Sequence, residues 1–107
     1  MRIASKVLNR DQDGVSGFLA YPATAARRPG IVVLHHANGV TADHKIAAAE
    51  LAGLGYATLV PNLYHMLGVP GDSHIGRGAE LQQRLNDDEF LRVIGDAWRS
   101  LARRADV

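Results

Sequence analysis

The sequence contains no cysteine, which excludes three kinds of site from the chain. Without a thiol there is no disulfide framework, no thiolate metal centre and no cysteine nucleophile. The histidines offer no substitute, because their spacing follows neither H-E-x-x-H nor another metal-binding pattern. They stand at positions 35, 36, 44, 65 and 74. We therefore expect no bound metal ion.

An excess of charge of one sign, long apolar runs and phosphate-binding loops are absent too. The 107 residues carry 12 basic and 11 acidic side chains, so we expect neither nucleic acid nor a membrane surface as a partner. No run reaches the roughly 18 apolar residues of a membrane span. The N-terminus MRIASKVLNR has no signal-peptide core, and we expect a cytoplasmic protein. Neither G-x-G-x-x-G nor G-x-x-x-x-G-K-[ST] occurs, so we expect no cofactor.

The N-terminal sequence predicts a β-hairpin. Residues 2–9 and 15–21 are the expected strands, and Asp11–Gly14 between them is a turn signal. A polar connector follows, and then Ile31–Leu34, a largely β-branched run without alternation. Such a run is typical of a strand that is buried on both faces, as in a parallel sheet.

A helix and a second parallel strand should follow. Thr41 can cap a helix over 42–54, and Gly55 stands where a left-handed residue ends a helix. Residues 56–60 form the next expected strand. Apolar residues at three- and four-residue steps, interrupted by Glu50, predict the buried stripe of the helix: Ile46, Ala47, Leu51 and Leu54.

The last expected element is a helix over about 87–104. Asn86 and Glu89 resemble a capping box. One apolar face then consists of Phe90, Ile94, Ala97, Trp98 and Leu101. The order of elements predicts an α/β fold with three layers: a β-hairpin, a βαβ unit and a C-terminal helix. We expect residues 1–107 to form a single partial domain, whose 31–34 strand has an open apolar edge suited to self-association.

Two segments of the chain resemble the dienelactone hydrolase family of α/β-hydrolases. PGIVVLHHANGV, from Pro29 to Val40, is similar to the third strand of that family and the loop after it. LGYATLVPNLY, from Leu54 to Tyr64, is similar to its Gly-Tyr, apolar run, Pro-Asp-Leu-Tyr pattern, with Asn62 in place of the usual Asp. The resemblance implies an eight-stranded sheet, of which this chain supplies the N-terminal half.

The resemblance also implies hydrolysis of carboxylic esters or lactones through an acyl-enzyme. The nucleophile elbow of the family, G-x-C-x-G or G-x-S-x-G, lies on the strand after the last helix of this chain. The acid and the catalytic histidine come later still. None of the three has a matching position in this sequence, so we expect no triad-dependent turnover from the chain alone. With the missing part supplied, a small ester or lactone is the expected partner.

The oxyanion hole is the part of the site that the resemblance places in this chain. It implies that the main-chain N–H of Ala37 donates to the oxyanion. His36 stands where family members usually carry Glu, and it offers hydrogen bonds but no fixed negative charge. Asn38 could shape the pocket or simply allow the turn. Tyr64 could line a substrate cleft or pack on the sheet.

Other polar residues have simpler expected roles. His35 should point away from His36 and act as a structural polar group at the end of its strand. Asn62 should hydrogen-bond nearby main chain. Ser73, in Gly71–Ile75, lacks both the second glycine and the preceding strand of a nucleophile elbow.

Two other classes of function compete with the hydrolase. The chain could be a complete non-catalytic half-domain that binds or assembles through its exposed strand edge. A nucleotide-binding fold shares the βαβ unit, but that argument rests on analogy between folds alone.

Overall fold

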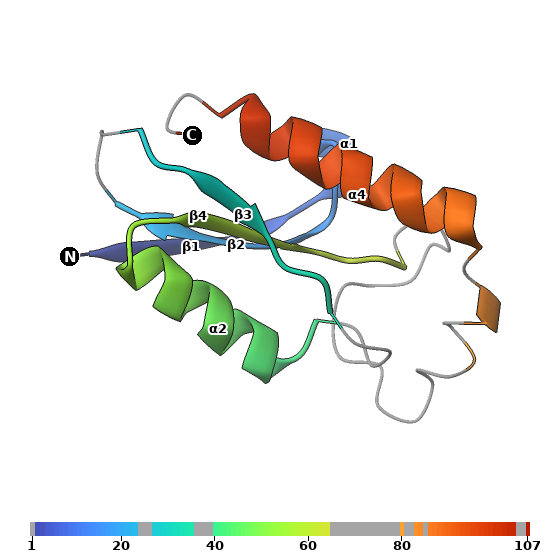
Figure 1. Cartoon of the computed structure of the whole chain (residues 1–107), viewed down its shortest axis with the longest axis horizontal. Helices are drawn as coiled ribbons and strands as arrows, with labels where there is room; N and C mark the ends of the chain where they lie inside the picture. The colour runs from blue at the N-terminus through green and yellow to red at the C-terminus, as the bar shows by residue number, and fades with distance from the viewer. Residues whose placement is uncertain are drawn as a thin grey trace.

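The computed structural model describes residues 2–23, 27–35, 40–64, 80, 83–84, 86–104 and 107. Its strands are β1 (Ile3–Leu8), β2 (Gly17–Pro22), β3 (Gly30–Val32) and β4 (Ala57–Pro61). Its helices are α1 (Arg10–Asp13), α2 (Ala42–Gly53) and α4 (Asp87–Ala102). The strands form one mixed sheet in the order β1-β2-β4-β3, between α2 and α4 (Figure 1). This arrangement confirms the expected three-layer α/β fold.

The N-terminal hairpin has the expected antiparallel pairing but not the expected turn. Ile3 pairs with Pro22 and Leu8 with Gly17. Between the strands, the expected turn is replaced by the single helical turn α1. The Asp13 carboxylate accepts a hydrogen bond of 2.8 Å from the N–H of Asn9, just before α1. This bond satisfies a donor that has no partner inside a helix, and so favours a helical turn here.

The β3–α2–β4 unit places two parallel strands next to each other. Gly30 pairs with Ala57 and Val32 with Leu59. Because β4 also pairs with β2, it lies inside the sheet, and all of its residues are buried. Gly55 has a φ of 106° and ends α2 as expected. β3 stops at Val32, short of the expected 31–34 strand. The expectation that this strand is buried on both faces was wrong, because none of its three residues is buried and Leu34 is 42% exposed.

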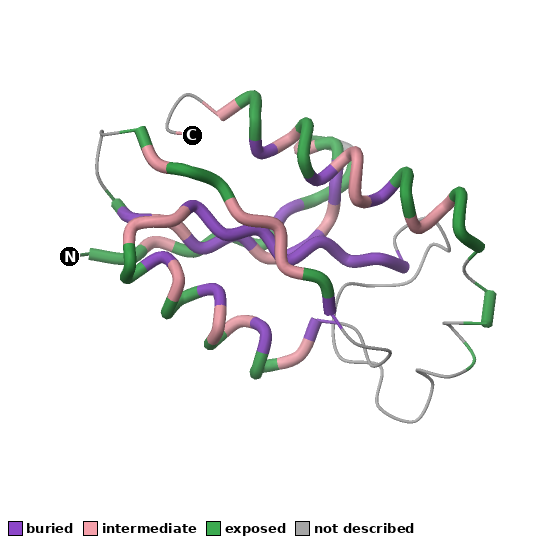
Figure 2. Tube along the Cα trace, viewed as in Figure 1, coloured by how far each residue is buried: buried purple, intermediate pink, exposed green. Residues whose placement is uncertain are grey.

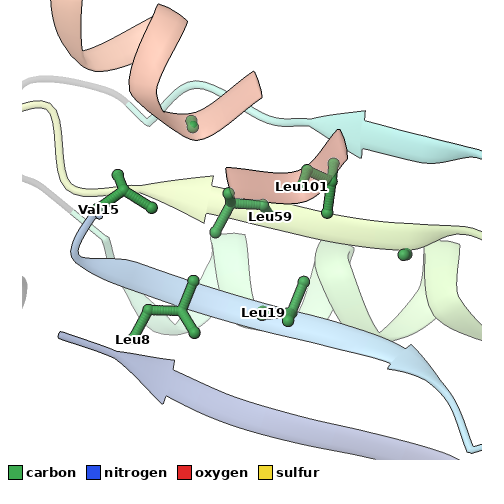
Figure 3. Packing of buried hydrophobic residues seen from close by; sticks show 7 residues of the cluster. Leu8, Val15, Leu19, Leu59 and Leu101 are labelled. Carbon is green, nitrogen blue, oxygen red and sulfur yellow. The ribbon is translucent and has the colours of Figure 1, made fainter. Parts of the chain in front are cut away.

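Hydrophobic clusters fill both faces of the sheet because strand side chains alternate between them. On the α4 face, Leu19 of β2 and Leu59 of β4 pack with Leu101 of α4 (Figure 3). On the α2 face, the neighbouring residues Ala20 and Val60 pack against alanines of the helix. Within the described residues, no helix is both long and apolar enough to cross a membrane.

The buried face of α2 differs from the expected stripe. Figure 2 shows buried and exposed positions alternating along the helix. Its buried residues are His44, Ala48 and Ala52. Ile46 and Leu54, which the prediction placed inside, are 57% and 75% exposed. Small side chains let the helix axis lie close to β2 and β4, so the larger apolar residues stay outside. The expected stripe was wrong because it weighed hydrophobicity and not size.

The prediction for α4 is confirmed in part. Ala97 and Leu101 are buried as expected, and Val93 joins them. Trp98 is 65% exposed, so the prediction that it faces the core was wrong. The Asn86 cap is present, since its Oδ1 accepts a hydrogen bond of 2.8 Å from the Glu89 N–H.

Candidate active site

The carboxyl ends of β3 and β4 lie at the same edge of the sheet, because the two strands are parallel. His35 follows β3, and Asn62, Leu63 and Tyr64 follow β4 directly. All four residues are buried. Open α/β sheets bind their ligands beyond the carboxyl ends of the strands. This edge is therefore the candidate site.

His35 ties the chain after β3 to the chain after β4. Its Nε2 accepts a hydrogen bond of 2.9 Å from the main-chain N–H of Leu63. Its ring also lies against Tyr64, with 5.2 Å between the ring centroids. His35 thus has the structural role that we expected at the end of its strand.

His44 is a member of this cluster that the sequence analysis missed. Its Nδ1 accepts a hydrogen bond of 3.2 Å from the Thr41 N–H, and it lies 3.0 Å from Thr41 Oγ1. Its ring stands edge-on to that of His35, with centroids 6.2 Å apart. The available signal was Thr-x-x-His, which puts an acceptor where a capping box has Glu or Gln.

Asn62 organises the chain as it leaves the sheet, as expected. Its Oδ1 accepts a hydrogen bond of 3.0 Å from the Tyr64 N–H, and its own N–H donates to the Ser16 carbonyl over 2.8 Å. The first bond holds a turn and the second anchors that turn to the start of β2. Together they fix the position of Tyr64 beside His35.

Tyr64 is the one predicted site residue in the part of the chain that the structure describes. It is 2% exposed. Three others lie outside the described residues: His36, Ala37 and Asn38. The residues next to this segment, His35 and Val40, are both buried. Ser73, which we rejected as a nucleophile, also lies outside the described residues.

Burial raises the pKa of the Tyr64 phenol above its ordinary value of 10.0. We expect this shift to make the fold sensitive to alkali. Above pH 10 the unfolded chain releases the phenol proton before the folded chain does, so stability falls as pH rises. The slope should not exceed about 1.4 kcal/mol per pH unit, the limit for one proton.

The measurement is the urea midpoint between pH 8 and 11.5 for the wild type and for Tyr64→Phe. The loss above pH 10 should be smaller in Tyr64→Phe, because phenylalanine has no proton to release. Tyr56→Phe is the matched control, since Tyr56 is only half-buried. Equal alkaline slopes in the wild type and Tyr64→Phe would contradict the prediction.

The described residues contain no group of three or more His, Asp or Glu that could hold a metal ion. The chemistry that they offer consists of two buried imidazoles, a phenol and a carboxamide. These groups can donate or accept hydrogen bonds, and they can hold neighbouring main chain in position. The described part of the site therefore offers oriented hydrogen-bond donors and acceptors.

Known structures share this fold over slightly less than half of their own length. A protein assigned as a dienelactone hydrolase from Klebsiella pneumoniae superposes with a TM-score of 0.80 at 20% identity. A dienelactone hydrolase-like promiscuous phosphotriesterase from metagenomic libraries superposes with a TM-score of 0.74, also at 20% identity. Both superpositions cover 100% of this chain, which spans 47% and 46% of those structures. No curated protein matches the chain.

The family comparison agrees with the structural one. The model of the dienelactone hydrolase family matches residues 15–106, from just before β2 to beyond the end of α4. The match includes the β3–α2–β4 unit and the whole candidate site. The chain belongs to the dienelactone hydrolase family.

Proposed function

We propose that this chain is part of a hydrolase of carboxylic esters or lactones that works through an acyl-enzyme. The observation that carries the proposal is the junction of His35 with Leu63 and Tyr64, at the carboxyl ends of two parallel strands. The family match spans both segments of this junction. In α/β-hydrolases the loop after the third strand supplies an oxyanion donor. The N–H of Ala37 is that donor in the proposal.

The reaction needs further groups outside the matched half. A Ser or Cys attacks the ester carbonyl, a histidine takes its proton and an acid orients the histidine. The C–O bond to the alcohol breaks and the alcohol leaves with the proton. Water then hydrolyses the acyl-enzyme. Ala37 stabilises both tetrahedral intermediates, while His36, Asn38 and Tyr64 contact the substrate.

The test uses the gene product at its natural length, with p-nitrophenyl acetate and dihydrocoumarin as substrates. Ala37→Pro removes the donor N–H, and we expect kcat to fall by about 10²–10³. Ala37→Gly keeps the N–H and is the matched control. Intact mass should also reveal an acylated protein. An unacylated protein, or equal rates for Ala37→Pro and Ala37→Gly, would refute the proposal.

Assembly through the β3 edge is a second candidate function. Among the described strands, β3 has β4 as its single neighbour. An apolar groove runs beside it, lined by Gly30, Val32, Trp98, Leu101, Ala102 and Val107. An open apolar edge can pair with another strand. A second copy of this chain is the proposed occupant, because 12 basic and 11 acidic residues leave little repulsion between copies.

Hydrogen bonds show which groups of β3 such pairing would use. The Pro29 carbonyl accepts from the Ala57 N–H, and the Val33 N–H donates to the Leu59 carbonyl. Main-chain groups alternate sides along a strand, so those of Val32 face the open edge. Val32→Pro should therefore turn a dimer into a monomer in light scattering. Val32→Ala keeps the N–H and should stay dimeric; a monomeric wild type would exclude this assembly.

A further inference from the structure

Two histidine rings accept main-chain hydrogen bonds near the places where the chain leaves β3 and enters α2. His35, after β3, accepts the Leu63 N–H over 2.9 Å. His44, in the first turn of α2, accepts the Thr41 N–H over 3.2 Å. The rings also contact each other, with centroids 6.2 Å apart. We infer that His35 and His44 are paired positioning residues that fix the end of β3 and the start of α2 against the chain after β4.

The two bonds require opposite tautomers. A main-chain N–H can donate only to a ring nitrogen that carries no proton. His35 accepts at Nε2, so its proton is on Nδ1. His44 accepts at Nδ1, so its proton is on Nε2. Each ring thus has an assigned orientation, and a ring with both nitrogens protonated makes neither bond.

The surroundings of the two rings suit this role. Both histidines are less than 10% exposed, so a main-chain donor left without its acceptor would have little water to replace it. The Tyr64 ring packs on His35 and limits its rotation. The Nδ1 of His44 accepts from the N–H of Thr41, the residue that precedes α2, and it lies 3.0 Å from the Thr41 hydroxyl oxygen.

The consequence for catalysis rests on the proposed function. The proposed oxyanion donor, Ala37, belongs to the segment that connects His35 to Thr41. Fixing both ends of a short segment restricts the conformations that it can adopt. Under the proposed function, the two histidines thus hold described residues on either side of the segment that carries the donor.

Nuclear magnetic resonance of the 107-residue chain tests the tautomers without substrate or variant. Long-range ¹H–¹⁵N spectra distinguish protonated from bare ring nitrogens. We expect His35 as the Nδ1–H form and His44 as the Nε2–H form at pH 8. The same tautomer in both rings, or two rings that exchange between forms, would overturn the inference.

Substitutions with an acceptor at either ring position test the bonds themselves. His35→Gln places an oxygen near the position of Nε2, whereas His35→Asn places it near Nδ1. For His44, the order is reversed: His44→Asn keeps an oxygen near the accepting Nδ1, whereas His44→Gln moves it toward Nε2. We expect amide exchange of Leu63 to quicken about tenfold in His35→Asn but not in His35→Gln. Amide exchange of Thr41 should likewise quicken about tenfold in His44→Gln but not in His44→Asn.

The amide of Leu19, inside the sheet, reports general loss of stability in each variant. Equal exchange of Leu63 in His35→Asn and His35→Gln would overturn the inference for His35, and the same holds for Thr41 with His44. If a variant fails to fold, the tautomers of the wild type still decide the question. None of these experiments measures hydrolysis. The positioning role of the two histidines and the proposed enzyme activity can therefore be refuted separately.

Discussion

Gly17→Ala should destabilise the fold by at least about 3 kcal/mol, although it adds a single methyl group. Gly17 begins β2 and pairs with Pro61 at the end of β4. A Cβ on Gly17 would clash with the Val60 carbonyl oxygen and lie 2.8 Å from the Cα of Pro61. These are main-chain atoms of an interior strand, so they cannot move aside as a flexible side chain can. The strands must separate there.

The same change should disturb the candidate site. Asn62 follows Pro61 and donates to the carbonyl of Ser16, next to Gly17. Separation of β2 from β4 would stretch this bond and shift the turn that holds Tyr64. We therefore expect the Tyr64 amide to exchange faster in Gly17→Ala than the loss of global stability requires.

Urea unfolding of the wild type, Gly17→Ala and Gly53→Ala measures the effect. Gly53→Ala is the matched control, because nothing lies within 4 Å of a Cβ built on Gly53. In α2 the added methyl should be neutral or stabilise by up to about 1 kcal/mol. A Gly17→Ala midpoint within the error of the wild type would show that β2 and β4 are not in this close contact.

The order of elements could be predicted because its signals are local. The β-branched run at Ile31–Leu34, the glycine after α2 and the buried run before Pro61 each indicate an element without knowledge of its neighbours. Parallel pairing of β3 and β4 follows from the helix between them. The candidate site edge follows in turn, because it is set by where two parallel strands end.

The buried faces of the helices could not be predicted in the same way. A hydrophobic stripe identifies the core face only when large apolar residues point inward. In α2 that face belongs to alanines, and the choice depends on how closely β2 and β4 approach the helix. In α4 the exposed Trp98 beside the β3 edge misled the prediction for the same reason: partners outside the helix decide its burial.

Some residues of the candidate site could also be predicted from local sequence, and others could not. Asn62 and His35 were predictable as loop organisers, because polar residues at strand ends bond to nearby main chain. The bond of His44 to Thr41 had a local signal in Thr-x-x-His, but its contact with the ring of His35 could not be predicted, because only the fold brings the two rings near each other. Ala37, His36 and Asn38 rest on the family resemblance, since no spacing in the sequence alone assigns an oxyanion donor.

Leu59→Ala should cost about 2–5 kcal/mol, a large share of the 5–15 kcal/mol by which domains are usually stable. Leu59 is 1% exposed and lies in the middle of the sheet, opposite Leu19 on β2 and Val32 on β3. Its side chain belongs to the cluster under α4. Truncation leaves a cavity that neighbours in regular strands cannot collapse to fill.

Leu54→Ala is the matched control, because the same atoms are removed from a side chain that is 75% exposed. Its cost should stay within about 0.5 kcal/mol. Two double-mutant cycles then test whether α4 packs on the sheet. Leu59→Ala and Leu101→Ala should couple by about 0.5–3 kcal/mol, because both side chains line one cluster. Leu59→Ala and Ala48→Gly act on opposite faces and should be additive; additivity in both cycles would mean that α4 does not pack on β4.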